Sequence, residues 1–273
     1  MEIHLPMDVV ITDGDEKFTE LDFYYGSKAL EGTSEIITVL TNTILNQEVV
    51  TKIPSIQGIN ASFRNNYEGS FGQKFMLKIV GDEQQKAFRA MGENAFFDLV
   101  SFYLSRPSMV PYEFTMNRSK KIADGMKELY IPLMKRLHIP LLKLHKPIEE
   151  QNYKVLLKRK RTELVEFNNK TLGNLEIETL DKERMVIQAS VTRFNRLTGT
   201  GRVILEEDSE SISFEPAINW RDFPDKQKKK LSRNLDANNQ SQEFTTLKLE
   251  VTIIRNYFGA IKKLSLHKVI IEA

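Results

Sequence analysis

The chain contains no cysteine among its 273 residues. Disulfides, thiol catalysis and zinc sites built from thiolates are therefore excluded together. No run of about 18 apolar residues occurs, so we expect no membrane-spanning helix. The first residues lack a basic flank followed by an apolar stretch, so we expect no signal peptide and a reducing, cytoplasmic location.

What is present is the composition of a soluble globular protein, with 41% hydrophobic and 28% charged residues. The length allows one large domain or two ordinary ones. The net charge of +2 hides an uneven distribution along the chain. Residues 1–115 hold 9 Lys and Arg against 16 Asp and Glu, residues 116–161 hold 13 against 4, and residues 162–273 hold 17 of each.

This basic middle segment has two interpretations. It favours a basic helix that lies against its own acidic domain or against a second copy of the chain. The alternative is a surface that attracts an anionic partner, either nucleic acid or a membrane surface. Pro132 and Pro140 interrupt the apolar stripe of residues 117–146, so we expect this helical segment to be kinked or divided.

Hydrophobic periodicity predicts an α+β protein: a mixed α/β front domain that ends in the kinked basic segment, followed by a small antiparallel β-barrel of the OB or SH3-like kind. Pro147 and the polar residues after it mark the best linker, so we place the domain boundary between residues 150 and 151 and expect domains of 1–150 and 151–273. The expected helices cover residues 26–46, 82–103, 117–146 and 225–234, and the expected strands cover 7–12, 59–64, 72–80, 153–160, 164–167, 175–179, 185–194, 211–214, 244–255 and 261–271.

The strongest local signal is the stretch of residues 191–205, in which two strand-forming runs flank Thr198-Gly199-Thr200-Gly201. Glycine adopts the backbone angles that a tight turn requires, so a β-hairpin is predicted here. The segment resembles part of the cold-shock domains, which stack bases on exposed aromatic residues. Of those aromatic positions only Phe194 is kept. A hairpin with Phe194 in the core and solvated arginines is favoured over a nucleic-acid face.

No motif for an enzyme is present. The sequence has no Walker A segment, no GxGxxG after a strand and no GxSxG elbow, and its four histidines form no HExxH pattern. We therefore assign no catalytic residue from the sequence, expect no metal and no cofactor, and lean towards a protein that is not an enzyme. A metal-dependent nuclease or hydrolase, with Glu176 or Glu178 in its site, stays open as an alternative.

A resemblance covers most of the chain. The phrases Asp13-Gly14, Ala29-Leu30-Glu31-Gly32 and Gly69-Ser70-Phe71, together with the hairpin of residues 194–203 and Ser213-Phe214, are similar to those of a bacterial two-domain family. That family joins an α+β domain to a β-barrel, and it has no established activity. The resemblance implies an accessory protein of a bacterial defence or mobile-element system.

From these patterns we expect a non-enzymatic binding or adaptor protein that engages a partner protein or nucleic acid. An oligomerising scaffold is the remaining alternative, so the partner set includes a second copy of the chain. The binding residues that we expect are the hairpin residues Arg193, Phe194, Arg196 and Arg202 and the basic run Lys158, Arg159, Lys160 and Arg161.

Overall fold

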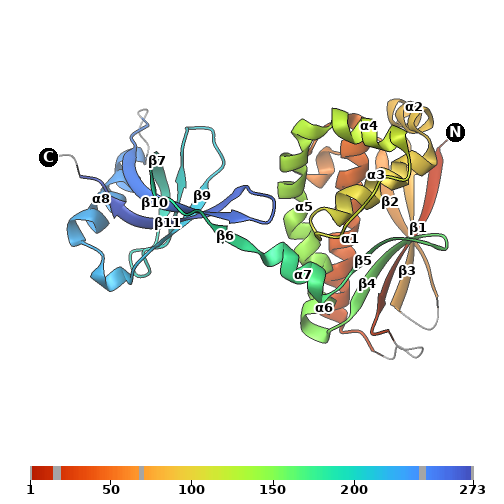
Figure 1. Cartoon of the computed structure of the whole chain (residues 1–273), viewed down its shortest axis with the longest axis horizontal. Helices are drawn as coiled ribbons and strands as arrows, with labels where there is room; N and C mark the ends of the chain where they lie inside the picture. The colour runs from red at the N-terminus through yellow and green to blue at the C-terminus, as the bar shows by residue number, and fades with distance from the viewer. Residues whose placement is uncertain (1, 15–19, 68–70, 240–243, 272–273) are drawn as a thin grey trace. The chain divides into compact units, whose positions relative to one another are not determined.

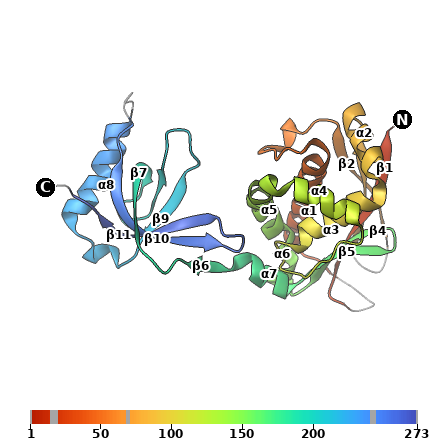
Figure 2. The same cartoon turned by 45° about the horizontal axis from the view of Figure 1, so that its top comes forward.

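The computed structural model describes residues 2–14, 20–67, 71–239 and 244–271. Gly69 and Ser70, which carry part of the family resemblance, lie outside the described residues. The chain forms two compact units, Met1–Glu176 and Ile177–Ala273. Figure 1 and Figure 2 show the elements of both units.

The described part of unit 1 contains a five-stranded antiparallel sheet in the order β2-β3-β1-β4-β5. Burial alternates along the first half of β1, where Leu5 and Met7 are buried and His4 and Pro6 are exposed. Side chains alternate between the two faces of a strand, so one face of this sheet is covered and the other is open. The helices supply the cover, and α1 packs along α5 (Figure 1).

The elements of unit 1 are β1 (Ile3–Thr12), α1 (Phe23–Asn46), η1 (Ile53–Ser55), β2 (Ile59–Tyr67), β3 (Phe71–Ile79), α2 (Asp82–Met91), α3 (Glu93–Ser105), α4 (Asn117–Gly125), η2 (Lys127–Leu129), α5 (Tyr130–Leu144), α6 (Lys146–Gln151), β4 (Lys154–Arg159), β5 (Thr162–Phe167) and α7 (Asn169–Glu176).

The elements of unit 2 are β6 (Glu178–Leu180), β7 (Met185–Phe194), β8 (Gly201–Ile204), β9 (Ile212–Pro216), η3 (Trp220–Asp222), α8 (Asp225–Asn238), β10 (Leu247–Asn256) and β11 (Ile261–Val269). Strands β7, β8, β9, β11 and β10 pair in that order, and β10 pairs again with β7, which closes a barrel. The β9–β11 pairing is parallel.

The order and direction of the strands distinguish between the two expected barrel types, OB and SH3-like. Three strands form a meander, α8 follows the third, and the last two strands form a hairpin whose second strand runs parallel to the third. This is the OB arrangement. Leu231 of α8 is fully buried in the same core as Val203, Phe214 and Leu266, so the helix contributes to the barrel interior.

The α+β class and the small C-terminal barrel are confirmed, but the barrel is mixed and not wholly antiparallel, because β9 and β11 pair in parallel. The division between the units lies after Glu176 and not at residue 150. The reason is the pairing of β4. Residues Lys154 to Lys158 pair with β1, so the β4–β5 hairpin completes the sheet of unit 1.

Two further elements differ from the sequence prediction. The helix expected over residues 82–103 is broken at Gly92, whose φ of 86° ends α2. The strand expected over residues 175–179 is the end of α7 followed by β6. The basic segment divides into α4, η2, α5 and α6 as expected, and Pro140 lies inside α5.

Candidate functional site

A row of polar side chains crosses four adjacent strands of the barrel. Arg193 of β7 pairs with Arg202 of β8, Arg202 pairs with Ser213 of β9, and Ser213 pairs with Lys263 of β11. Paired residues in a sheet point to the same face. We call Arg193, Arg202, Ser213 and Lys263 the barrel row.

The neighbouring row explains why the barrel row faces outward. Phe194 pairs with Gly201, Gly201 with Phe214, and Phe214 with Leu264. Phe214 and Leu264 are buried in the barrel core, and Phe194 packs against that core. Successive residues of a strand alternate between faces, so the barrel row lies on the outside. Phe194 is therefore a packing residue, in agreement with the interpretation that the sequence favoured.

The loop between β7 and β8 holds the row in register. The Asn195 backbone N–H donates to the Thr200 carbonyl at 2.8 Å, and the Gly199 N–H donates to the Asn195 carbonyl at 2.8 Å. Gly199 has a φ of 75°, and a Cβ added there would overlap the indole ring of Trp220. Glycine is thus required twice, by the backbone angle and by the close contact.

The charges of the barrel row differ in how they are held. The Arg202 guanidinium donates to the hydroxyl and the carbonyl oxygen of Ser211, both at 2.7 Å. Lys263 lies 3.0 Å from the Glu215 carboxylate, and the hydrogen bond to Glu215 is the main reason that the pKa of this lysine is raised. The exposed Arg193 has no ion pair or side-chain hydrogen bond to any residue that the structure describes. It is the cation of the row that is most available to a ligand.

A shallow depression of about 290 Å³ follows the barrel row and is also lined by Asn195, Thr200 and Glu215. Glu215 is the one carboxylate among the lining residues. Because Glu215 is already paired with Lys263, the two arginines give this surface a net positive charge.

Arg196 lies outside the row, in a second groove of about 380 Å³ between the hairpin loop and α8. The floor of the groove includes Trp220, whose indole N–H donates to the Arg196 carbonyl at 2.9 Å. The Lys228 ammonium lies 5.2 Å from the centre of the Trp220 ring. Sequence reasoning missed Trp220. A signal that could have identified this residue is the position of the one tryptophan of the chain, just before a lysine-rich helix.

The basic run lies in unit 1, at the β4–β5 hairpin. Arg159 is committed to packing: it forms an ion pair with Glu93 and lies 4.4 Å from the centre of the Phe97 ring. Lys158 pairs with Asp8 across the sheet. Burial raises the pKa of Asp8, although the charges of Lys74 and Lys158 oppose this effect. Lys160 and Arg161 form the exposed tip, where Lys160 has a φ of 56°.

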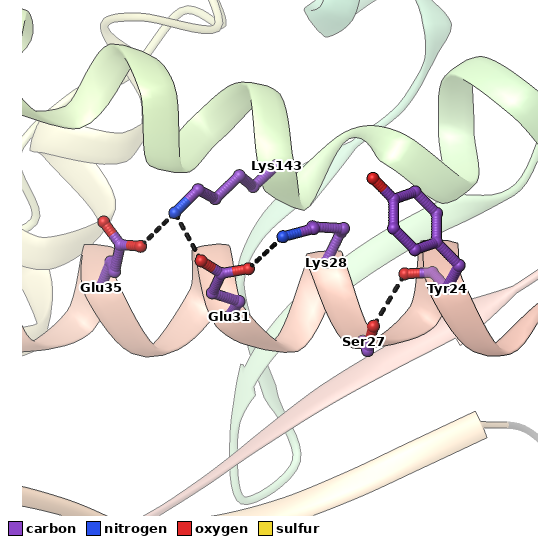
Figure 3. Close-up of polar contacts among 6 residues, drawn as sticks. All are labelled: Tyr24, Ser27, Lys28, Glu31, Glu35 and Lys143. Atoms are coloured by element: carbon purple, nitrogen blue, oxygen red, sulfur yellow. Dashed lines mark hydrogen bonds and ion pairs between the residues drawn. The ribbon is translucent and has the colours of Figure 1, made fainter.

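The basic middle segment pairs with an acidic helix of its own unit. Lys143 of α5 lies 2.7 Å from Glu31 and 2.5 Å from Glu35 of α1, and Lys28 also contacts Glu31 (Figure 3). Arg136 adds a contact of 3.5 Å to Glu35. Hydrogen bonds from Lys143 and Lys28 lower the pKa of Glu31. The intramolecular interpretation of the charge pattern therefore accounts for these residues.

Glu176 and Glu178 are the carboxylates of the metal-dependent alternative. Within the described ranges, no group of three or more His, Asp or Glu side chains is placed to hold a metal ion. Glu178 lies 2.7 Å from Lys262 and 3.7 Å from Lys263, and Glu176 is exposed at the end of α7. The hydrogen bond from Lys262 lowers the pKa of Glu178.

None of the described helices combines the length and the hydropathy that are needed to cross a membrane.

The resemblance to the bacterial two-domain family stays a prediction. Comparisons with family models, curated proteins and solved structures give no match for this chain.

Proposed function

We propose that this chain is a non-enzymatic binding protein that holds the phosphate backbone of single-stranded nucleic acid across the barrel row. The observation that carries the proposal is the register that aligns Arg193, Arg202, Ser213 and Lys263 on four adjacent strands. In OB barrels, oligonucleotides bind on the face of the second and third strands, which are β8 and β9 in this barrel.

The dimensions and chemistry of the row support this ligand. Three steps between neighbouring strands, each of about 4.8 Å, separate Arg193 from Lys263 by about 14 Å, which is longer than one phosphate group. Arginine binds phosphate oxygens through two parallel N–H groups. Phe194 faces the core, so the row offers no ring for base stacking, and we expect binding with little sequence preference.

A fluorescence-anisotropy titration of labelled single-stranded DNA and RNA over a salt series tests the proposal. Each phosphate contact on a single strand contributes about 0.7 to the slope of log affinity against log salt. The Arg193→Ala/Arg202→Ala variant removes two contacts, so its slope should be shallower by about 1.4.

The Arg221→Ala/Lys226→Ala variant is the matched control, because it removes two exposed cations of unit 2 that do not line the row. It should keep most of the affinity and the slope. Absence of binding at low salt, tighter binding of duplex than of single strands, or equal losses in the two variants would overturn the proposal. Far-ultraviolet circular dichroism checks that each variant is folded.

A further inference from the structure

A deep cleft of unit 1 has no part in the function proposed above. Its volume is about 780 Å³, which falls within the range of small-molecule sites. It opens between α3, the loop after α3, α4 and the start of α5; α3 and α4 lie side by side (Figure 2). Its aromatic lining consists of Phe102, Tyr103, Tyr112, Phe114 and Tyr130.

One wall of the cleft is fixed by a buried carboxylate. Asp98 of α3 accepts a hydrogen bond of 2.6 Å from the Tyr112 hydroxyl and bonds of 3.1 and 3.2 Å from the backbone N–H groups of Thr115 and Met116. Burial by itself would raise the pKa of Asp98, but the hydrogen bonds from Tyr112 and Thr115 outweigh it and lower this pKa. The loop is thus held in place by an ionised side chain, and the cleft is formed without a ligand.

The aromatic side chains form a packed cluster along the wall and carry hydrogen-bond donors. The Phe102 and Phe114 rings lie 4.4 Å apart with 33° between their planes. The Arg106 guanidinium lies 4.8 Å from the centre of the Phe102 ring. Burial raises the pKa of Tyr103 to about 12 and also raises the pKa of Tyr130, so both hydroxyls stay protonated and can donate.

The charges at the rim favour an anion. Arg106 and Lys120 line the cleft, and neither has a carboxylate partner among the residues that the structure describes. Lys127, also in the lining, lies 3.3 Å from Asp124, so this pair adds no net charge. Glu113 is the second carboxylate of the lining, so three cations and two carboxylates leave the cleft with a net charge of +1. An exposed lysine that already has an ion-pair partner gives up that ion pair when it binds a ligand, whereas Arg106 and Lys120 have no ion pair to give up.

We propose that this cleft binds a nucleoside phosphate, with the base against the aromatic wall and the phosphates on Arg106 and Lys120. Aromatic side chains hold a base by stacking. The two cations supply charge-assisted hydrogen bonds to the phosphate oxygens. A nucleoside phosphate is the ligand class that uses both features at once.

Isothermal titration calorimetry on the full chain, with ATP, adenosine and inorganic triphosphate as separate probes, tests this assignment. We expect ATP to bind one site per chain, and more tightly than either probe that lacks the base or the phosphates. Lys120→Ala should weaken ATP binding by at least about tenfold, because a hydrogen bond to a charged group contributes about 1.5–3 kcal/mol.

Lys121→Ala is the matched control: it removes the same charge from the next residue of α4, which is exposed and does not line the cleft. It should leave ATP affinity unchanged, as should Arg193→Ala/Arg202→Ala in the barrel row. Absence of ATP binding, equal losses in Lys120→Ala and Lys121→Ala, loss of ATP binding in the barrel-row variant, or triphosphate binding as tight as ATP would each overturn the proposal.

Discussion

Gly32 is the residue of α1 that allows the closest approach of α5. A Cβ added at Gly32 would lie 2.7 Å from the backbone nitrogen of Leu144 and closer still to the carbonyl oxygen of Pro140. Both obstacles are backbone atoms, so no side chain can rotate to make room. For the Gly32→Ala variant, the two helices would have to separate by about 0.7 Å to restore an ordinary contact of 3.4 Å at the Leu144 nitrogen, and by more than that to clear the Pro140 oxygen.

The change in stability of Gly32→Ala is the sum of an unfavourable packing effect and a favourable helix-propensity effect. Overpacking a close-packed interface costs about 1–3 kcal/mol. Alanine has a higher helix propensity than glycine, which stabilises the variant by about 1 kcal/mol. Separation also lengthens the contacts of Lys143 with Glu31 and Glu35 (Figure 3), but these groups are partly exposed and contribute little. We therefore expect a net destabilisation of up to about 2 kcal/mol, and a fall in the melting temperature of unit 1 of up to about 8 °C.

The assay is thermal unfolding followed by circular dichroism at 222 nm in the helix band, compared with Gly173→Ala. Gly173 is an exposed residue of the helix α7, and a Cβ added there meets nothing within 4 Å. This control keeps the propensity gain without the clash, so its melting temperature should rise. If Gly32→Ala also raises the melting temperature, the close approach of α1 and α5 at Gly32 is refuted.

Two further predictions concern a buried histidine and the barrel hairpin. His145 donates from Nδ1 to the Leu141 carbonyl, and burial lowers its pKa from 6.5 to about 4. Between pH 6.5 and 4, the unfolded chain therefore binds a proton at His145 that the folded chain does not bind. Urea denaturation should show stability falling by about 3 kcal/mol as the pH drops from 6.5 to 4, and His145→Gln should flatten that part of the profile. Gly199→Ala should destabilise unit 2 more than Gly259→Ala, since both glycines have positive φ but only Gly199 meets the Trp220 ring. Urea unfolding followed by Trp220 emission measures this difference, and equal losses would contradict the contact.

Much of the fold follows from local patterns. The Thr198–Gly201 phrase predicts the β7–β8 hairpin because glycine alone fits its turn, and the apolar periodicity of residues 26–46 predicts α1. The error in the predicted domain boundary at residue 150 could not be recognised from the local sequence pattern. The chain at Pro147 looks like a linker, and only the pairing of β4 with β1, far apart in the sequence, assigns residues 154–167 to unit 1.

The candidate site was only partly predictable, for a similar reason. Arg193 and Arg202 belong to one hairpin, so their proximity follows from its turn. Lys263 joins them through the parallel β9–β11 pairing, which has no local signature. The register shift between Val191 and Arg193 also changes which residues face outward, and a strict alternation of faces does not anticipate it.

The central position of β1 has a consequence for how unit 1 is made. This strand is synthesised before its two neighbours, β3 and β4, and β4 follows it by more than half the length of unit 1. Until residue 159 has left the ribosome, at least one edge of an apolar strand lacks its native partner. Nascent chains that stall between β3 and β4 should therefore depend on chaperones more than the finished protein does.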